Sequence, residues 1–233
     1  LTSTTSTITA VTSEGRALHV HAAELVDASG RTRGGSAAQL FGTNKGEIIQ
    51  TILTNSKEHL VLATESGVIK RLTTEEVQKT QNAKQVIKLK TGDRVVSAFC
   101  APEKIDIGIT ASDGQFLRMP VSSVSIQGRG ASGVAGMKLK NASVVVAAEA
   151  ILGDDFVTTI FSNQTAKVTP VAEYESIGRN RVGVRITKVN DDSKLTIAKI
   201  GPLTNLLAVM ATDDDPKKPD PNPVQLLLES SKR

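Results

Sequence analysis

The chain has 233 residues, which allows one large domain or two small ones with a substantial core. Aromatic residues make up only 3% of it, so the core must be built from Val, Ile, Leu and Ala. A formal net charge of +4 permits nucleic-acid binding without requiring it, and no apolar run approaches the roughly 18 residues of a membrane span.

Hairpin-like segments recur along the chain, each with two apolar runs around a polar turn. They lie at residues 10–20, 62–72, 110–119 and 160–168, with a degenerate fifth at 207–214. Their turns fall at positions 15, 67, 114, 164 and 214, so the spacings are 52, 47, 50 and 50 residues. A period near 50 residues with about four strand-like segments per period is typical of propeller-type arrays.

We therefore predict an all-β fold: a propeller-like array of about five four-stranded blades of ~50 residues in a single domain. The approximate blades are 1–42, 43–100, 101–152, 153–200 and 201–233. No helix-length stretch has a 3.6-residue period, and residues 24–26 and 75–77 allow one helical turn each at most. A short final strand is expected at 224–228, after the acidic and proline-rich stretch 213–223.

Glycine-rich loops that carry arginine follow several of the hairpins. Residues 31–36 hold Arg31 and Arg33, residues 127–133 hold Arg129, and residues 177–183 hold Arg179 and Arg181. The loop 31–36 alone is more simply interpreted as a solvated connection. Recurrence at similar positions instead favours phosphate contacts, because glycine lets a duplex backbone come close while arginine supplies charge and donors.

The candidate phosphate-contacting residues are Arg16, Arg31, Arg33, Lys70, Arg71, Arg118, Gln127, Arg129, Lys138, Lys140, Lys167, Arg179, Arg181 and Arg185. We expect Arg71, Arg118, Arg129 and Arg179 to contribute most, because they recur at equivalent positions. The further lysines at 79, 84, 88 and 90 are diluted by acidic neighbours and are interpreted as a solvated face. The acidic and proline-rich stretch 213–223 is a candidate competitor for the same basic surface.

No catalytic, metal or nucleotide-binding constellation is visible. His19 and His21 share one strand face, but only His59 is available to extend them into a metal site. Tyr174 lies between two glutamates, a poor setting for a nucleophile, and Cys100 is expected to be a buried, reduced thiol. We therefore expect no cofactor and no catalytic site in this chain, which looks like a fragment of a longer cytoplasmic protein.

The motifs together resemble the C-terminal domain of the A subunit of bacterial type IIA topoisomerases. Thr64, Gly67 and Arg71 match that family's blade signature, and the segments 127–134 and 137–139 match its recurring Gly-Arg-x-x-x-Gly-Val segment. The resemblance covers about residues 8–210 and implies a β-pinwheel, in which neighbouring blades exchange strands. It also implies a non-catalytic domain that binds and bends duplex DNA on a basic perimeter and presents a segment to the cleavage core.

The parent enzyme implied by this resemblance is an ATP-dependent type II topoisomerase. Its expected partners are duplex DNA, its own N-terminal cleavage core and the ATPase B subunit in an A2B2 assembly, with ATP and Mg in the parent and no membrane. The gyrase box, Gln-(Arg/Lys)-Arg-Gly-Gly-(Arg/Lys)-Gly, is not intact in this sequence. Segment 127–133 has Gly128, Ala131 and Ser132 where the box has a cation, a glycine and a cation.

The missing box favours the A subunit of topoisomerase IV over that of DNA gyrase. The alternative, a gyrase wrapping domain whose box lies in a blade upstream, stays open. A propeller-like module that docks proteins is a more remote alternative, and it predicts an apolar groove as the main surface feature. A hydrolase or lyase on a propeller would need convergent carboxylates or histidines, which the sequence does not offer.

Overall fold

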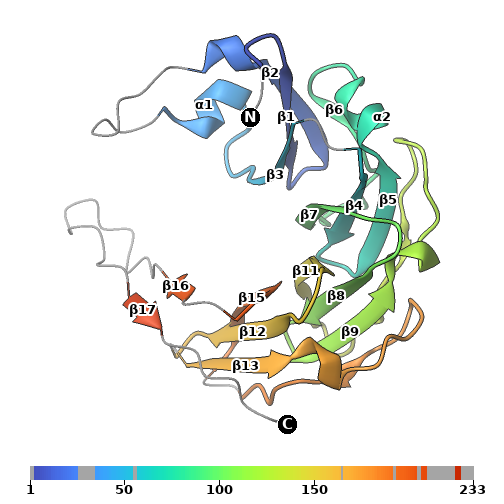
Figure 1. Cartoon of the computed structure of the whole chain (residues 1–233), viewed down its shortest axis with the longest axis vertical. Helices are drawn as coiled ribbons and strands as arrows, with labels where there is room; N and C mark the ends of the chain where they lie inside the picture. The colour runs from blue at the N-terminus through green and yellow to red at the C-terminus, as the bar shows by residue number, and fades with distance from the viewer. Residues whose placement is uncertain are drawn as a thin grey trace.

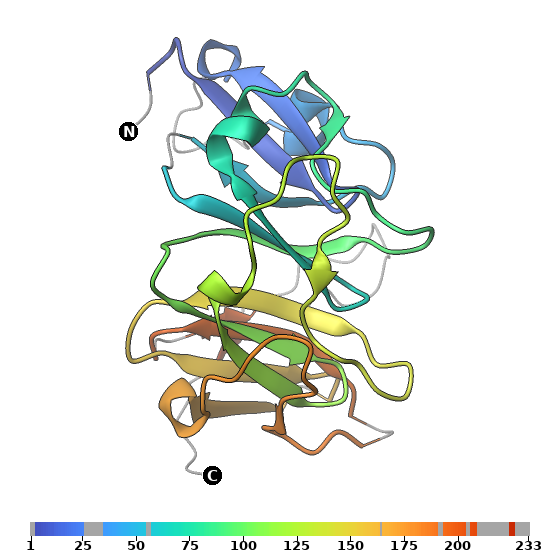
Figure 2. The same ribbon diagram turned by 90° about the vertical axis from the view of Figure 1, so that its right-hand side faces the viewer.

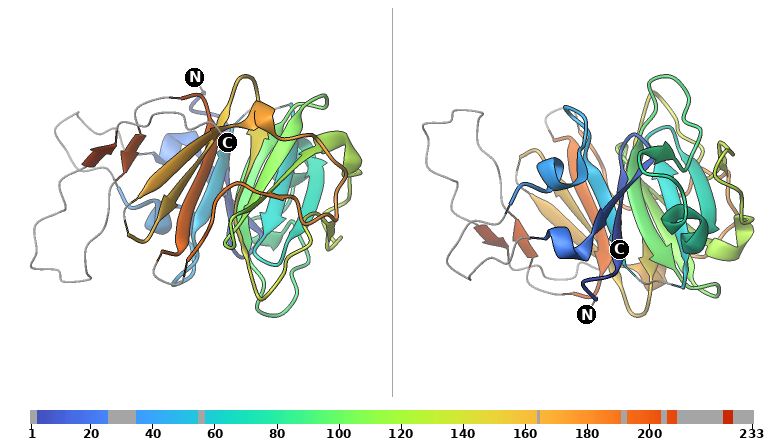
Figure 3. Two further views of the ribbon diagram at one scale, coloured as in Figure 1. Left: turned by 90° about the horizontal axis from the view of Figure 1, so that it is seen from below. Right: turned by 90° about the horizontal axis from the view of Figure 1, so that it is seen from above.

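The computed structural model describes residues 3–25, 35–54, 57–163, 165–190 and 193–203, and two short strands at 206–208 and 224–226. Antiparallel sheets follow one another around a common axis and together trace an open arc (Figure 1). Neighbouring sheets lie face to face, as the views along the arc show (Figure 3). The predicted all-β repeat architecture is confirmed.

Each large sheet runs from an inner strand near the axis to an outer strand. The first contains β3 (Ile49–Leu53), β1 (Thr7–Thr12), β2 (Arg16–His21) and β6 (Lys84–Gln85). The second contains β7 (Val95–Ala101), β4 (His59–Thr64), β5 (Val68–Thr73) and β10 (Val134–Ala135). The third contains β11 (Val145–Ile151), β8 (Asp106–Ala111), β9 (Gln115–Pro120) and β14 (Val184–Arg185). The fourth contains β15 (Leu195–Gly201), β12 (Phe156–Phe161) and β13 (Ala166–Pro170), and β16 (Leu206–Ala208) pairs with β17 (Val224–Leu226).

Neighbouring repeats exchange their outer strands. In each of the first three sheets the outermost strand comes from the following repeat: β6 pairs with β2, β10 with β5, and β14 with β9. The innermost strands, β3, β7, β11 and β15, line the axis (Figure 1). This exchange is the pinwheel arrangement that the family resemblance implied. The first sheet also reaches past residue 42, because β3 is its inner strand.

In the described part of the chain the helices are short, of three to five residues, as the missing 3.6-residue period predicted. They are η1 (Ala22–Glu24), α1 (Ala37–Phe41), α2 (Thr74–Gln78), η2 (Val121–Ser123) and η3 (Val171–Glu173). The sequence prediction missed α1, which Ser36 caps by accepting a hydrogen bond from the Gln39 amide, and which ends at Gly42 with a φ of 65°. A serine followed six residues later by glycine is a recognisable start and stop pair. Within the described ranges, no helix is long and apolar enough to cross a membrane.

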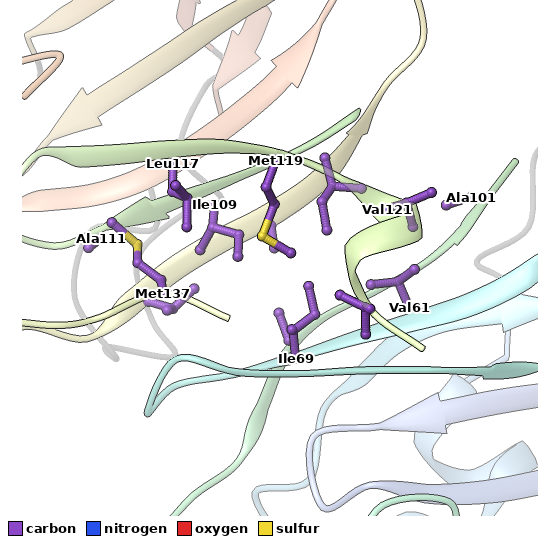
Figure 4. Packing of buried hydrophobic residues seen from close by; sticks show 14 residues of the cluster. Val61, Ile69, Ala101, Ile109, Ala111, Leu117, Met119, Val121 and Met137 are labelled. Atoms are coloured by element: carbon purple, nitrogen blue, oxygen red, sulfur yellow. The ribbon is translucent and has the colours of Figure 1, made fainter. Parts of the chain in front are cut away.

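Aliphatic side chains fill the space between the second and third sheets. Val61 and Ile69 from the second sheet belong to one buried cluster with Ile109 and Leu117 from the third (Figure 4). Met137, which follows the exchanged strand β10, extends this cluster. Each blade therefore buries its faces against its neighbours, and the exchanged strands add hydrogen-bonded pairing between consecutive repeats.

Candidate nucleic-acid interface

Three stretches carry the chain from one blade to the outer edge of the preceding blade. These exchange segments, residues 83–92, 125–140 and 176–190, contain no Asp or Glu. Their cations are all solvent-exposed: Lys84, Lys88, Lys90, Arg129, Lys138, Lys140, Arg179, Arg181, Arg185 and Lys188. We refer to these ten side chains as the cationic band.

Backbone hydrogen bonds join the exchange segments into one continuous layer on the outer side of the arc. The Lys88 amide donates to the Ala131 carbonyl at 3.1 Å, and the Lys138 amide donates to the Arg181 carbonyl at 2.8 Å. Figure 2 faces this side, where the segment between β9 and β11 rises to α2 and the orange segment after β13 lies below it. The cationic band therefore runs across three consecutive blades without interruption.

The band has an internal period that the sequence analysis overlooked. Lys88, Lys138 and Lys188 recur at intervals of 50 residues, each directly after a buried residue of its exchange segment. Burial of Ile87, Met137 and Thr187 fixes the backbone, and the next side chain then points to solvent. The interpretation of the lysines at 84, 88 and 90 as a solvated face missed this recurrence, which was visible in the sequence.

The cations of the band are not paired with carboxylates in the part of the chain that the structure describes. Among the described residues, the ion pairs involve none of its ten cations. The open cleft beside Arg129, of about 820 Å³, is lined by polar and charged groups: Thr73, Glu75, Glu76, Lys79, Thr80, Gln81, Lys84 and Arg129. Glu75 in this cleft pairs with Lys79, and Glu76 accepts a hydrogen bond from the Arg129 backbone amide.

Seven of the predicted contact residues lie on or at the edge of the band. Six of them are the exposed cations Arg129, Lys138, Lys140, Arg179, Arg181 and Arg185. Gln127 is half-buried beside them, and its backbone amide donates to the Arg71 carbonyl at 2.8 Å. Arg31 and Arg33 lie outside the described residues.

Arg71 and Arg118, expected as main phosphate contacts, instead hold the blades together. The Arg71 guanidinium is 3% exposed, donates to the carbonyls of Val121 and Val124 at 3.3 Å each, and pairs with Glu103. At the equivalent position, Arg118 donates to the Tyr174 carbonyl at 3.2 Å and to Asp106 at 2.8 Å.

Both arginines thus fasten the single helical turn of the next repeat to their own sheet. Their recurrence, correctly noticed in the sequence, reflects packing and not exposure.

Lys70, Lys167 and Arg16 are also held by the protein. Lys70 is fully buried and donates to three carbonyls, and the half-buried Lys167 donates to the Ile186 carbonyl at 2.6 Å. Arg16 pairs with the buried Glu47, its Nε donating to Oε1 at 2.9 Å. None of the three offers a free charge to a phosphate in this structure.

Burial of Lys70 predicts how the free energy of unfolding depends on pH. Desolvation lowers the pKa of Lys70 to about 8, with Glu76 acting in the opposite direction, whereas the unfolded chain keeps the ordinary value of 10.5. Between these values the unfolded state binds more protons, so stability must rise with pH in this window. Urea unfolding should show the free energy of unfolding rising by on the order of 2 kcal/mol relative to Lys70→Met between about pH 7.5 and 10.5.

The difference between the two proteins isolates this one group, because all other titrations cancel. A difference that stays flat over this window would show that Lys70 keeps its ordinary pKa in the fold.

The candidates His19 and Tyr174 are held within the fold. The described residues contain no group of three or more His, Cys, Asp or Glu side chains placed to hold a metal ion. His19 Nδ1 lies 2.9 Å from Thr9 Oγ1, and burial lowers the pKa of His19. Tyr174 is buried edge-on against Phe116, with ring centroids 5.3 Å apart. His19 and Tyr174 thus contribute to packing and hydrogen bonding inside the fold.

Comparison with known families decides the relationship. A family model described as the DNA gyrase C-terminal domain, beta-propeller, matches residues 58–102, 109–151 and 165–200, more than half of the chain. The chain belongs to this family. The first two matched stretches contain the second and third hairpin repeats, and the last begins within the fourth.

Relatives within the gyrase C-terminal family are named as A subunits of DNA gyrase. The one from Kosmotoga olearia is 31% identical over 184 residues, covering 75% of this chain and 23% of the relative. The one from Mycolicibacterium smegmatis is 29% identical over 211 residues, covering 88% and 24% respectively. The chain thus spans about a quarter of the length of these curated relatives.

Solved structures share the fold. The C-terminal domain of DNA topoisomerase IV superposes with a TM-score of 0.84 at 19% identity, covering 99% of this chain and 73% of the other. The DNA gyrase A C-terminal domain gives 0.70 at 21% identity, covering 87% and 68%. Because both gyrase and topoisomerase IV domains are similar in this way, the preference for topoisomerase IV over gyrase is not resolved by these likenesses.

Proposed function

We propose that this chain is a non-catalytic domain that binds duplex DNA along the cationic band and bends it. The observation that carries the proposal is the continuity of the band: ten exposed cations, outside every ion pair of the described residues, on three hydrogen-bonded exchange segments that contain no acidic residue. Such a surface suits the phosphate backbone, which is recognised by charge and not by sequence. Family membership supports the same conclusion.

Bending follows from the shape of the surface. The exchange segments belong to consecutive blades that turn around the axis, so the band curves with the arc (Figure 1). A duplex that keeps contact with all three segments must follow that curve, and the cost depends on how readily its sequence deforms. The affinity is therefore expected to respond to DNA bendability more than to base sequence.

A salt series tests this proposal. The affinity of the chain for a linear duplex of about 40 base pairs and for a pre-bent minicircle should be measured between roughly 50 and 300 mM salt. If about six phosphates are neutralised, log affinity should fall against log salt with a slope near −5, and the minicircle should bind more tightly. A salt-independent affinity, or no binding at the lowest salt, would contradict the proposal.

For the parent protein we propose a type IIA topoisomerase in the bacterial cytoplasm, with ATP and Mg bound outside this domain. Its N-terminal cleavage core and a B subunit would complete an A2B2 enzyme. Between the two enzyme types we favour topoisomerase IV, since the segment 127–133 lacks the cations of the gyrase box at 128 and 132. A gyrase chain with its box elsewhere is the alternative.

Restoring the box tests this finer assignment. The triple variant Gly128→Lys, Ala131→Gly, Ser132→Lys should increase the linking-number change that the chain imposes on nicked plasmid closed by ligase. If the unaltered chain already changes the linking number as much as the variant does, the gyrase assignment is favoured.

The alternative of a protein-docking propeller has less support. It predicts an apolar groove, whereas the cleft beside Arg129 is lined by polar and charged side chains.

A further inference from the structure

Lys70 is a buried cation that forms no ion pair with any of the described residues. It is 0% exposed, and its ammonium donates to the carbonyls of Val86 at 2.8 Å, Arg129 at 2.8 Å and Ala131 at 2.9 Å. Val86 belongs to the exchange segment 83–92, and the other two acceptors belong to the exchange segment 125–140. One ammonium therefore joins two neighbouring stretches of the cationic band.

Arg129 is held through both of its peptide groups. Its amide donates to Glu76 Oε1 at 2.8 Å, and its carbonyl accepts from Lys70 Nζ at 2.8 Å. Its guanidinium then donates to Thr80 Oγ1 at 2.5 Å from the wall of the open cleft. The counterpart Arg179, 50 residues later, makes one long side-chain contact, at 3.4 Å to the Ala135 carbonyl. Arg129 is thus the preorganised member of the two.

The fold itself does not need an ammonium at this position. Thr73, Pro120 and Pro170 each pair with the first residue of the partner strand in their hairpin. The residues three positions before them, Lys70, Leu117 and Lys167, are therefore structurally equivalent. Leu117 is fully buried there, so an apolar side chain fits the site. Lys167 is half-buried and reaches one carbonyl. Burying an ammonium is costly, so its presence at position 70 calls for a role beyond filling the core.

We propose that Lys70 is a positioning residue for the DNA interface, which fixes the backbone of Arg129 so that its guanidinium is preset to receive a phosphate in the adjoining cleft. This inference rests on the proposed function. Glu76 assists from the amide side of Arg129, and its charge is balanced by the nearby ammonium. An arginine that is already ordered loses less side-chain freedom when DNA binds, which raises affinity without adding a contact.

A double-mutant cycle tests the proposal. Lys70→Met should weaken duplex binding about fivefold and reduce the salt slope by about 1, whereas the matched variant Lys167→Met should change affinity by less than about twofold. In an Arg129→Ala background, Lys70→Met should have almost no effect, because its influence passes through Arg129. Urea unfolding of each variant checks that the fold is retained.

Equal weakening by Lys70→Met in both backgrounds would overturn the proposal, since a general structural role acts regardless of Arg129. The proposal would also be overturned if Lys70→Met left the DNA affinity unchanged while Arg129→Ala alone weakened it.

Amide hydrogen exchange separates this inference from the proposed function. In the absence of DNA, Lys70→Met should accelerate exchange at the Lys88 amide, which bonds to the Ala131 carbonyl, and at the Arg129 amide. Accelerated exchange with no DNA binding by the unaltered chain would support the positioning by Lys70 and reject only the DNA function. Unchanged exchange would overturn the positioning itself.

Discussion

Replacing Lys88, Lys138 and Lys188 together with alanine is expected to weaken duplex-DNA binding on the order of 10- to 100-fold at moderate salt. The three side chains are exposed, lie 50 residues apart and sit on three hydrogen-bonded segments, so they cover most of the length of the band. The salt slope should become shallower by about 3, because each lost phosphate contact removes about 0.9 from it. Titration of labelled duplex at several salt concentrations gives both quantities.

A triple variant of equal charge provides the control. Lys45, Lys57 and Lys104 are exposed and lie outside the exchange segments, so their replacement with alanine removes the same net charge away from the band. Binding should then fall only by the small change in long-range attraction, and the salt slope should stay nearly constant. If the two triple variants lose DNA affinity equally, net charge and not the band determines binding.

Sequence periodicity predicted the fold because each repeat is specified by local features, namely its turn residues and its alternating apolar residues. Asp113 and Gly114 form a hairpin turn in which Gly114 has a φ of +78°, and Gly15 and Gly67 have similar φ values of +70° and +84° in the two preceding repeats. Alternating apolar residues then fix which face of each strand is buried. Strand exchange was not available from this pattern, because β6, β10 and β14 are two-residue strands whose partners lie in another repeat. The family resemblance supplied it.

The candidate site was predicted less well, because a cation in a strand can be satisfied inside the protein. Lys70 and Arg71 follow one another on β5, and both are buried, on opposite faces of the sheet. Their acceptors are carbonyls of residues 16 to 61 positions further along the chain, which spacing in the sequence does not reveal. By contrast, Arg129 and Arg179 lie in loops between the strands, where exposure was a sound expectation.

Gly183→Ala is expected to cost about 3 kcal/mol of unfolding free energy, which corresponds to a fall in melting temperature of about 8 °C for a chain of this size. Gly183 has a φ of +81°, and an added Cβ would lie 2.2 Å from the Phe116 carbonyl oxygen and 2.6 Å from its carbon. Neither atom can move without breaking the pairing of β14 with β9. The exchange segment that carries Arg179, Arg181 and Arg185 should therefore be displaced, and DNA affinity should fall with stability.

Ala83→Gly separates backbone strain from crowding in this argument. Ala83 occupies the equivalent turn two repeats earlier with a φ of +60°, and it is exposed. It shows that the left-handed conformation alone is tolerated, at a cost of about 1 kcal/mol. Glycine at 83 relieves this strain but adds freedom to the unfolded chain, so the net change should stay within about 1 kcal/mol. If Gly183→Ala also costs no more than about 1 kcal/mol by thermal unfolding, close approach to Phe116 does not constrain the exchange segment, and strain alone explains the glycine.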